Sequence, residues 1–134
     1  MENRYYINSK YVLELSPDKI DENGYINDPE YNKYNNQNHY GLVHVYAHWC
    51  GHCKVMIPMI EELGELSNGH TDFNVVGINA TLKENTFIKN NVDGYPTLFF
   101  VDNNRKLHKY NDNGNRSYSN IAKNLIKFIK ESNI

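Results

Sequence analysis

The fold is decided by one stretch of the sequence, Trp49-Cys50-Gly51-His52-Cys53-Lys54, which holds both cysteines of the chain. An apolar run from Leu42 to Ala47 leads into this stretch. Apolar residues at helical spacing follow it, namely Met56, Met59 or Ile60, Leu63 and Leu66. Two cysteines at a strand-to-helix junction are typical of a redox dithiol, because the N-terminus of a helix stabilises a thiolate.

Length and charge limit the classes of function. The 134 residues carry a net charge of −2, and we expect them to form one domain, residues 1–134. A chain without a basic patch is not expected to bind nucleic acid. No window approaches the roughly 18 apolar residues of a membrane helix, so we expect no membrane partner. The N-terminus has no apolar signal core and the C-terminus no retrieval signal, which favours a cytoplasmic or virion-associated protein, and we expect a monomer.

Strands and helices alternate along the first part of the chain. We expect strands at Tyr11–Leu15, Leu42–Ala47, Phe73–Asn79, Leu98–Val101 and Lys106–Tyr110, and helices at Pro29 to about Asn36, Cys50 to about Ser67, Glu84–Asn91 and Ser119–Glu131. Pro58 should kink the second helix, and Asn68-Gly69 should stop it. Alternation predicts parallel strands with crossover helices, and the last two strands predict an antiparallel hairpin. The class is therefore α/β, with one mixed sheet between helices.

The sequence resembles the thioredoxin family, and within it the catalytic domains of protein disulfide isomerases. The resemblance runs from about Leu42 to Phe128 and depends on motifs in a fixed order. These motifs are Trp49–Lys54, the helix-kink proline Pro58, the segment Tyr95-Pro96-Thr97, and Tyr110 with Gly114 and Arg116. The resemblance implies a thioredoxin fold with about five strands. Residues 41–134 would form the core with the active site, and residues 1–40 a divergent strand, polar loop and short helix.

The two cysteines take different parts in the expected chemistry. Cys50 should lie at the helix N-terminus, partly exposed, and attack a substrate disulfide. Cys53, one turn along and more buried, should resolve the mixed disulfide. Gly51 and His52 should tune this exchange, because a histidine between the cysteines can stabilise the Cys50 thiolate. No cofactor is expected beyond the redox-active Cys50–Cys53 disulfide, and the expected partners are protein substrates with thiols or disulfides and a redox partner.

The resemblance also implies a substrate groove beside the dithiol. Pro96 would be cis and lie against the two cysteines, and its neighbours would offer backbone groups to an extended substrate. Trp49, Gly94 and Tyr95 would complete the groove. Arg116 would correspond to the mobile arginine of the isomerases, which lowers the pKa of the second cysteine; a surface arginine in a loop is the alternative.

Two positions depart from the isomerase pattern. His44 stands six residues before Cys50, where the family has a buried acid, and Gly77 stands where it has the lysine that pairs with this acid. Losing both together avoids an unpaired buried charge, and the absent side chain at Gly77 would leave room for the imidazole. One hypothesis is that His44 serves as the base for Cys53. The other is a neutral histidine that is hydrogen-bonded in the core.

Several functions remain open at this stage. The first is a thiol–disulfide oxidoreductase of the oxidase or isomerase type, favoured by His52; a thioredoxin-like reductase in a reducing compartment is the alternative. A metal-binding module would use the histidines and cysteines near residue 50, but their spacing does not converge on a tetrahedral site, and no metal is expected. A virion or structural component of thioredoxin fold is the remaining alternative.

Overall fold

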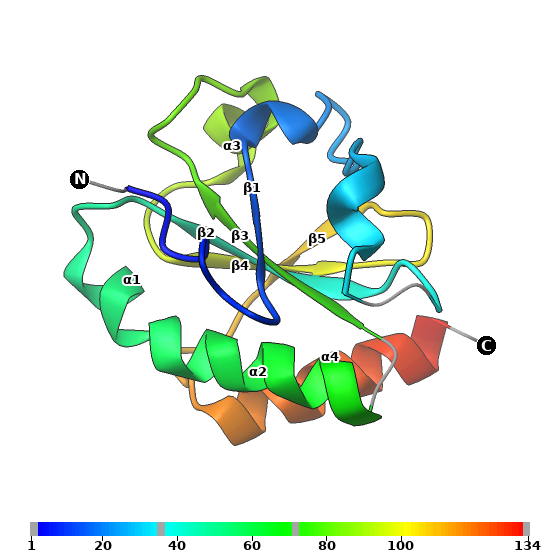
Figure 1. The fold of residues 1–134 in the computed structure, drawn as a ribbon. Helices are drawn as coiled ribbons and strands as arrows, with labels where there is room; N and C mark the ends of the chain where they lie inside the picture. Colours follow the sequence, from blue (N-terminus) through cyan, green and yellow to red (C-terminus); the bar gives the residue numbers. More distant parts are fainter. Residues whose placement is uncertain (1–2, 35–36, 71–72, 133–134) are drawn as a thin grey trace.

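The five strands form one mixed sheet in the order β1-β3-β2-β4-β5 (Figure 1). The computed structural model describes residues 3–34, 37–70 and 73–132. The strands are β1 (Leu13–Leu15), β2 (Gly41–Tyr46), β3 (Asn74–Asn79), β4 (Thr97–Val101) and β5 (Leu107–Tyr110). Strands β1, β3 and β2 run parallel, whereas β4 is antiparallel to both β2 and β5. The mixed sheet of an α/β thioredoxin fold is therefore confirmed.

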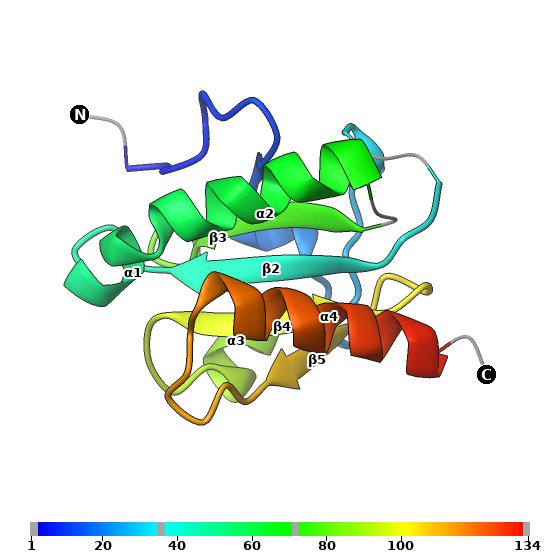
Figure 2. The same ribbon diagram turned by 90° about the horizontal axis from the view of Figure 1, so that it is seen from below.

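Helices cover both faces of this sheet. The α-helices are α1 (Gly51–Val55), α2 (Ile57–His70), α3 (Thr86–Asn91) and α4 (Tyr118–Ser132), and two 3-10 helices are η1 (Pro17–Lys19) and η2 (Pro29–Asn32). Helices α2 and α4 lie side by side on one face, and α3 with the 3-10 helices lies on the other (Figures 1 and 2). Each face has its own apolar cluster of buried side chains. No helix among the described residues is long and apolar enough to cross a membrane.

Strand β2 holds the centre of the sheet because its residues suit burial on both faces. All six of its residues are buried, and it pairs with β3 on one side and β4 on the other. Its side chains alternate between the clusters, with Leu42 and Tyr46 on the α2–α4 face and Val43 and Val45 on the opposite face. The C-terminal end of β2 and the turn that follows it are therefore fixed in position between the two helical layers.

The expected elements hold best where apolar periodicity is strong. The third strand, the hairpin and the last helix lie within a residue or two of their expected bounds. The first strand is shorter than expected, at Leu13–Leu15, and the short helix after Asp28 is a 3-10 turn, Pro29–Asn32. Its expected end near Asn36 lies outside the described residues. The N-cap is confirmed, because the Asp28 carboxylate accepts a hydrogen bond from the backbone N–H of Glu30 at 2.9 Å.

The long helix is interrupted near Pro58, as expected, but it ends later than expected. It is divided at Met56 into α1 and α2, two residues before the proline, because Pro58 has no N–H to donate to the Lys54 carbonyl. The stop at Asn68-Gly69 is wrong, since α2 continues to His70. A single glycine costs a helix only about 1 kcal/mol, which the packing of α2 on β3 and α4 outweighs.

The N-terminal segment, residues 3–12, completes the layer formed by α2 and α4 (Figure 2). Tyr11 and Val12 lie so close to Gly64 of α2 that a Cβ there would contact both of them. Tyr6 is buried against Gly77 of β3, where a Cβ would overlap its ring. The segment thus lies on the sheet face next to α2 and contacts the residues that surround the dithiol.

Candidate active site

The dithiol lies where β2 ends and α1 begins. Cys50 is the N-cap of α1, and its Sγ accepts a hydrogen bond from the backbone N–H of Cys53 at 3.2 Å. The turn is closed by the backbone N–H of Cys50, which donates to the Ala47 carbonyl at 3.0 Å. Both cysteines are free thiols. One turn of helix therefore places the first sulfur at the helix tip and the second residue beneath it.

Cys50 is less exposed than the sequence led us to expect. It keeps 6% of its surface and Cys53 keeps none, so the order of burial is as expected but the first cysteine is also buried. The reason is that its sulfur faces the amide of Cys53, while Met56 and Tyr95 belong to the same apolar cluster. A substrate disulfide must therefore come close to the helix tip to meet the Cys50 sulfur.

The Cys53 thiol is held in its neutral form. Burial raises its pKa to about 12, and the neighbouring Cys50 acts in the same direction. Two groups oppose this effect, the backbone N–H of Ala47 and the positive charge of Arg116. Cys53 consequently has to lose a proton before it can attack, and the Ala47 amide and Arg116 are the groups that favour its thiolate.

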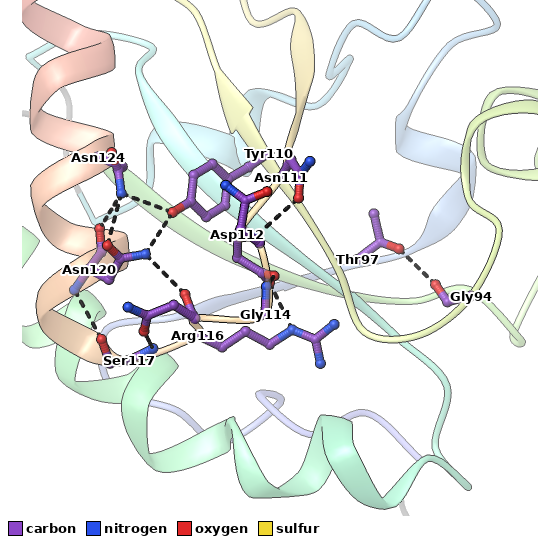
Figure 3. A network of polar contacts seen from close by, with 12 residues as sticks. Gly94, Thr97, Tyr110, Asn111, Asp112, Gly114, Arg116, Ser117, Asn120 and Asn124 are labelled. Atoms are coloured by element: carbon purple, nitrogen blue, oxygen red, sulfur yellow. Dashed lines mark hydrogen bonds and ion pairs between the residues drawn. The ribbon is translucent and has the colours of Figure 1, made fainter.

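Aromatic side chains border the dithiol. Trp49 is 65% exposed, and its ring meets that of Tyr95 edge to face, with centroids 5.9 Å apart. Burial, followed by the charge of Cys53, raises the pKa of Tyr95, and the Tyr95 ring packs against the apolar cluster that contains both cysteines. The Tyr95–Pro96 peptide is cis, as the resemblance implied. Gly94 is exposed, and its carbonyl accepts a hydrogen bond from the Thr97 hydroxyl at 2.7 Å (Figure 3).

Arg116 is carried by the loop between β5 and α4. Its Nε donates to the Asp112 carboxylate at 2.8 Å, and the backbone N–H of Gly114 donates to the same carboxylate (Figure 3). Arg116 lines a groove of about 300 Å³ together with Pro96 and Thr97. Its charge acts to lower the pKa of Cys53, against the larger effect of burial, and its role in the exchange remains a prediction.

His44 is a neutral imidazole in the core. It has no exposed surface, and burial, with a further contribution from Arg116, lowers its pKa to about 3. Its Nδ1 is hydrogen-bonded to the Tyr6 hydroxyl at 2.7 Å. Its Nε2 has no hydrogen-bond partner among the described residues. These contacts fit the hypothesis of a neutral, hydrogen-bonded core histidine, and the proton-transfer role remains a prediction.

The space left by Gly77 is filled by a residue that sequence reasoning did not consider. Gly77 lies beside His44 in the register of β3 and β2, as expected, but it is the Tyr6 ring that lies over it. On the other side of Gly77 lies Glu14 of β1. Tyr6 connects the two polar groups, because its backbone N–H donates to Glu14 at 3.0 Å and its hydroxyl is hydrogen-bonded to the Nδ1 of His44.

Glu14 is a second polar group of this sheet face, half-buried, that the sequence did not reveal. Burial raises its pKa to about 7, against the effect of hydrogen bonds from Tyr46 and from backbone amides. The Tyr46 hydroxyl donates to both carboxylate oxygens, at 2.7 and 2.8 Å. The alternation of Leu13, Glu14 and Leu15 would have placed an acid on one face of this strand, but nothing in the sequence shows which residues cover it.

The other histidines near the dithiol do not gather into a cluster. The His48 ring is hydrogen-bonded to Thr81 at 3.0 Å, and His52 is exposed on α1 beside Gly51. In the ranges 3–34, 37–70 and 73–132, no group of three or more His, Cys, Asp or Glu side chains is placed to hold a metal ion.

Comparisons with known proteins agree with this geometry. Residues 23–129 match the family model of thioredoxin. Protein disulfide-isomerase A4 of Bos taurus is 35% identical over 92 residues, which are 67% of this chain but 14% of that protein. Protein disulfide-isomerase of Medicago sativa is 33% identical over 91 residues, or 68% of this chain and 17% of that protein. The chain thus spans less than a fifth of the length of these relatives.

Two solved structures have a similar fold. The J-Trx1 fragment of ERdj5 superposes with a TM-score of 0.66 at 19% identity, over 94% of this chain and 55% of that chain. The first thioredoxin domain of mouse protein disulfide-isomerase A4 gives a TM-score of 0.59 at 26% identity, over 81% of this chain and 77% of that chain. With the family model matched over most of its length, the chain belongs to the thioredoxin family.

Proposed function

We propose that the chain is a thiol–disulfide oxidoreductase that acts on the disulfides of protein substrates. The observation that carries this proposal is the hydrogen bond from the Cys53 amide to the sulfur of Cys50 at the first turn of α1. It brings the second cysteine within reach of a sulfur that has just reacted. The disulfide isomerases among the relatives support the same chemistry.

The proposed exchange proceeds in two steps. The Cys50 thiolate attacks a substrate disulfide, so that a bond between Cys50 and one substrate sulfur forms and the other sulfur leaves as a thiolate. Cys53 then loses its proton to water and attacks Cys50. The Cys50–Cys53 disulfide forms and the second substrate thiolate is released. The substrate is reduced and the dithiol oxidised, and the reverse sequence oxidises a substrate dithiol. When another thiolate of the substrate attacks the mixed disulfide before Cys53 does, a new substrate disulfide forms, Cys50 leaves as a thiolate, and the substrate is isomerised.

We further propose the oxidase or isomerase direction, because exposed His52 stands between the two cysteines on α1, where an imidazole can stabilise the Cys50 thiolate relative to the disulfide. Trp49 and Tyr95 would hold the substrate chain beside the helix tip. An equilibrium titration against glutathione tests this direction. A potential near about −180 mV supports it, whereas one near about −270 mV would make the protein a reductase.

The activity itself is tested by refolding a small protein with scrambled disulfides in a glutathione buffer. Cys50→Ser should abolish the exchange, and Cys53→Ser should accumulate a mixed disulfide with the substrate, visible on a non-reducing gel. Lys123→Ala, an exposed change on α4, serves as the control and should leave the rate unchanged. Exchange at the wild-type rate by Cys50→Ser would contradict the proposal.

A further inference from the structure

The side chain of Tyr5 contacts the turn that carries the dithiol. Its hydroxyl is 3.1 Å from the Ala47 carbonyl and 2.9 Å from the His48 carbonyl, and it donates to this pair. These two residues connect the end of β2 with Trp49 and Cys50. The contacts span more than 40 positions in sequence, because Tyr5 belongs to the N-terminal segment, outside the family match of residues 23–129.

Tyr5 itself is firmly held. Its ring stacks on that of Tyr46, with centroids 4.0 Å apart and planes 12° apart. Its backbone N–H donates to the Tyr46 hydroxyl at 2.8 Å, and that hydroxyl in turn donates to the Glu14 carboxylate. The ring and backbone of Tyr5 are therefore held by Tyr46 of β2, which Glu14 of β1 holds in turn, and the Tyr5 hydroxyl is held by the turn after β2.

Ala47, one of the two residues that the Tyr5 hydroxyl contacts, interacts with both cysteines. The Ala47 carbonyl accepts the Cys50 amide at 3.0 Å, and the Ala47 N–H lowers the pKa of Cys53. Burial, followed by the charges of Cys53 and Cys50, raises the pKa of Tyr5 to about 12. Tyr5 is thus a neutral hydrogen-bond donor close to both sulfurs.

We propose that Tyr5 is a positioning residue of the dithiol site: its hydroxyl holds the turn at Ala47 and His48, where the Ala47 carbonyl accepts the Cys50 amide and the chain enters the helix that carries Cys53. The proposal rests on the proposed function. It adds Tyr5 to the active site, although this residue lies outside the segment matched by the family model.

The step that depends on the position of this turn is the attack by Cys53. In that step Cys53 gives its proton to water, forms a bond to the Cys50 sulfur and displaces the substrate thiolate. Among the described residues, the ionisable groups that interact electrostatically with Cys53 include Cys50, Tyr5, Tyr6, Tyr95 and Arg116. The backbone N–H of Ala47 and the charge of Arg116 favour the Cys53 thiolate, so the placement of the turn at Ala47 bears on this step.

The test is a stopped-flow reaction of the reduced protein with the chromogenic disulfide 5,5′-dithiobis(2-nitrobenzoate). The first chromophore is released when Cys50 attacks, and the second when Cys53 resolves the mixed disulfide. Tyr5→Phe should slow the second phase about fivefold, the factor expected for one ordinary hydrogen bond. It should also move the pH profile of that phase to higher pH, while the first phase stays unchanged.

Tyr11→Phe is the matched control, since it removes a hydroxyl from the same segment that makes no hydrogen bond to any residue the structure describes. It should leave both phases unchanged. An unchanged second phase in folded Tyr5→Phe overturns the proposal, as does an equal slowing of both phases. Absence of both phases in the wild-type protein would instead refute the proposed function.

A second variant covers the case in which Tyr5→Phe does not fold. Tyr46→Phe keeps the stacked ring and the hydroxyl of Tyr5, but removes the acceptor of the Tyr5 backbone N–H. Slowing of the second phase alone, by a smaller factor, supports the proposal. A second phase at the wild-type rate in Tyr46→Phe overturns it.

Discussion

The two faces of the sheet are buried in different ways. The face under η1, η2 and α3 is apolar, with Val43 and Val45 of β2 meeting aliphatic and aromatic neighbours. The face under α2 and α4 holds a row in register, Glu14, Gly77 and His44, that contains two ionisable groups, His44 buried and Glu14 half-buried. Burying such groups is unfavourable unless they are hydrogen-bonded. The comparison teaches that the face next to the dithiol depends on the N-terminal segment, residues 3–12, to cover its polar groups and hydrogen-bond to them.

Truncation of Tyr6 should lower the stability of the protein more than any other change considered. Tyr6→Ala removes a ring with 1% exposed surface and leaves the Nδ1 of His44 without its hydrogen-bond partner, the Tyr6 hydroxyl. We expect the free energy of unfolding to fall by about 4 kcal/mol. Urea unfolding at neutral pH measures it. Ile7→Ala, at a neighbouring residue that is 42% exposed, is the control and should change stability by less than about 0.5 kcal/mol. A similarly small effect of Tyr6→Ala would contradict the packing of the segment.

A methyl group added at Gly77 tests whether the Tyr6 ring is the group that fills the space over this glycine. In the wild-type protein Gly77→Ala forces its Cβ into the Tyr6 ring, and should cost about 2 kcal/mol. The same change in the Tyr6→Ala background should cost much less, since the ring is gone. The double-mutant cycle, measured by urea unfolding, gives the coupling between the two positions. Additive effects would mean that something other than Tyr6 fills the space over Gly77.

Most of the fold follows from local patterns in the sequence. The apolar run Leu42–Ala47 predicts a strand, and the helical spacing of Ile121, Ala122 and Leu125 predicts a helix. Both predictions need only the spacing of apolar residues along the chain. The kink proline and the turn at Asp102 to Arg105 are likewise local signals. The expected end of the helix at Asn68-Gly69 failed because the packing of α2 overrides one glycine.

The site was predictable only as far as it depends on the motif. Cys50, Cys53 and the cis peptide before Pro96 follow from the family resemblance, and the structure places them at one end of the sheet. Tyr5 and Tyr6 were not foreseen, because their partners are about 40 residues away in sequence. Contacts across such a distance have no periodic signature, and eleven tyrosines in one chain give no ground for choosing two.

The charge on Glu14 should affect stability only through its dependence on pH, and this dependence tests whether the two polar groups of the row oppose each other. The folded pKa of Glu14 is raised to about 7 from its ordinary value of 4.5, so the folded protein binds a proton here more tightly than the unfolded chain. Its contribution to stability is therefore present below pH 4.5 and is lost as the pH rises through 7. His44 has the opposite sign, because its lowered pKa makes the folded state less stable as the pH falls below 6.5.

Glu14→Gln isolates the first of these contributions, because His44 is present in both proteins and cancels from the difference. The stability of the wild-type protein relative to Glu14→Gln should rise as the pH falls from 7 to 4.5, by no more than about 1.4 kcal/mol for each unit of pH. Urea unfolding at several pH values gives this difference, and Glu65→Gln on the exposed side of α2 should show no such trend. A difference that does not change with pH would mean that Glu14 is already ionised in the folded protein. In that case its hydrogen bonds from Tyr46 and Tyr6, rather than burial, would determine its charge.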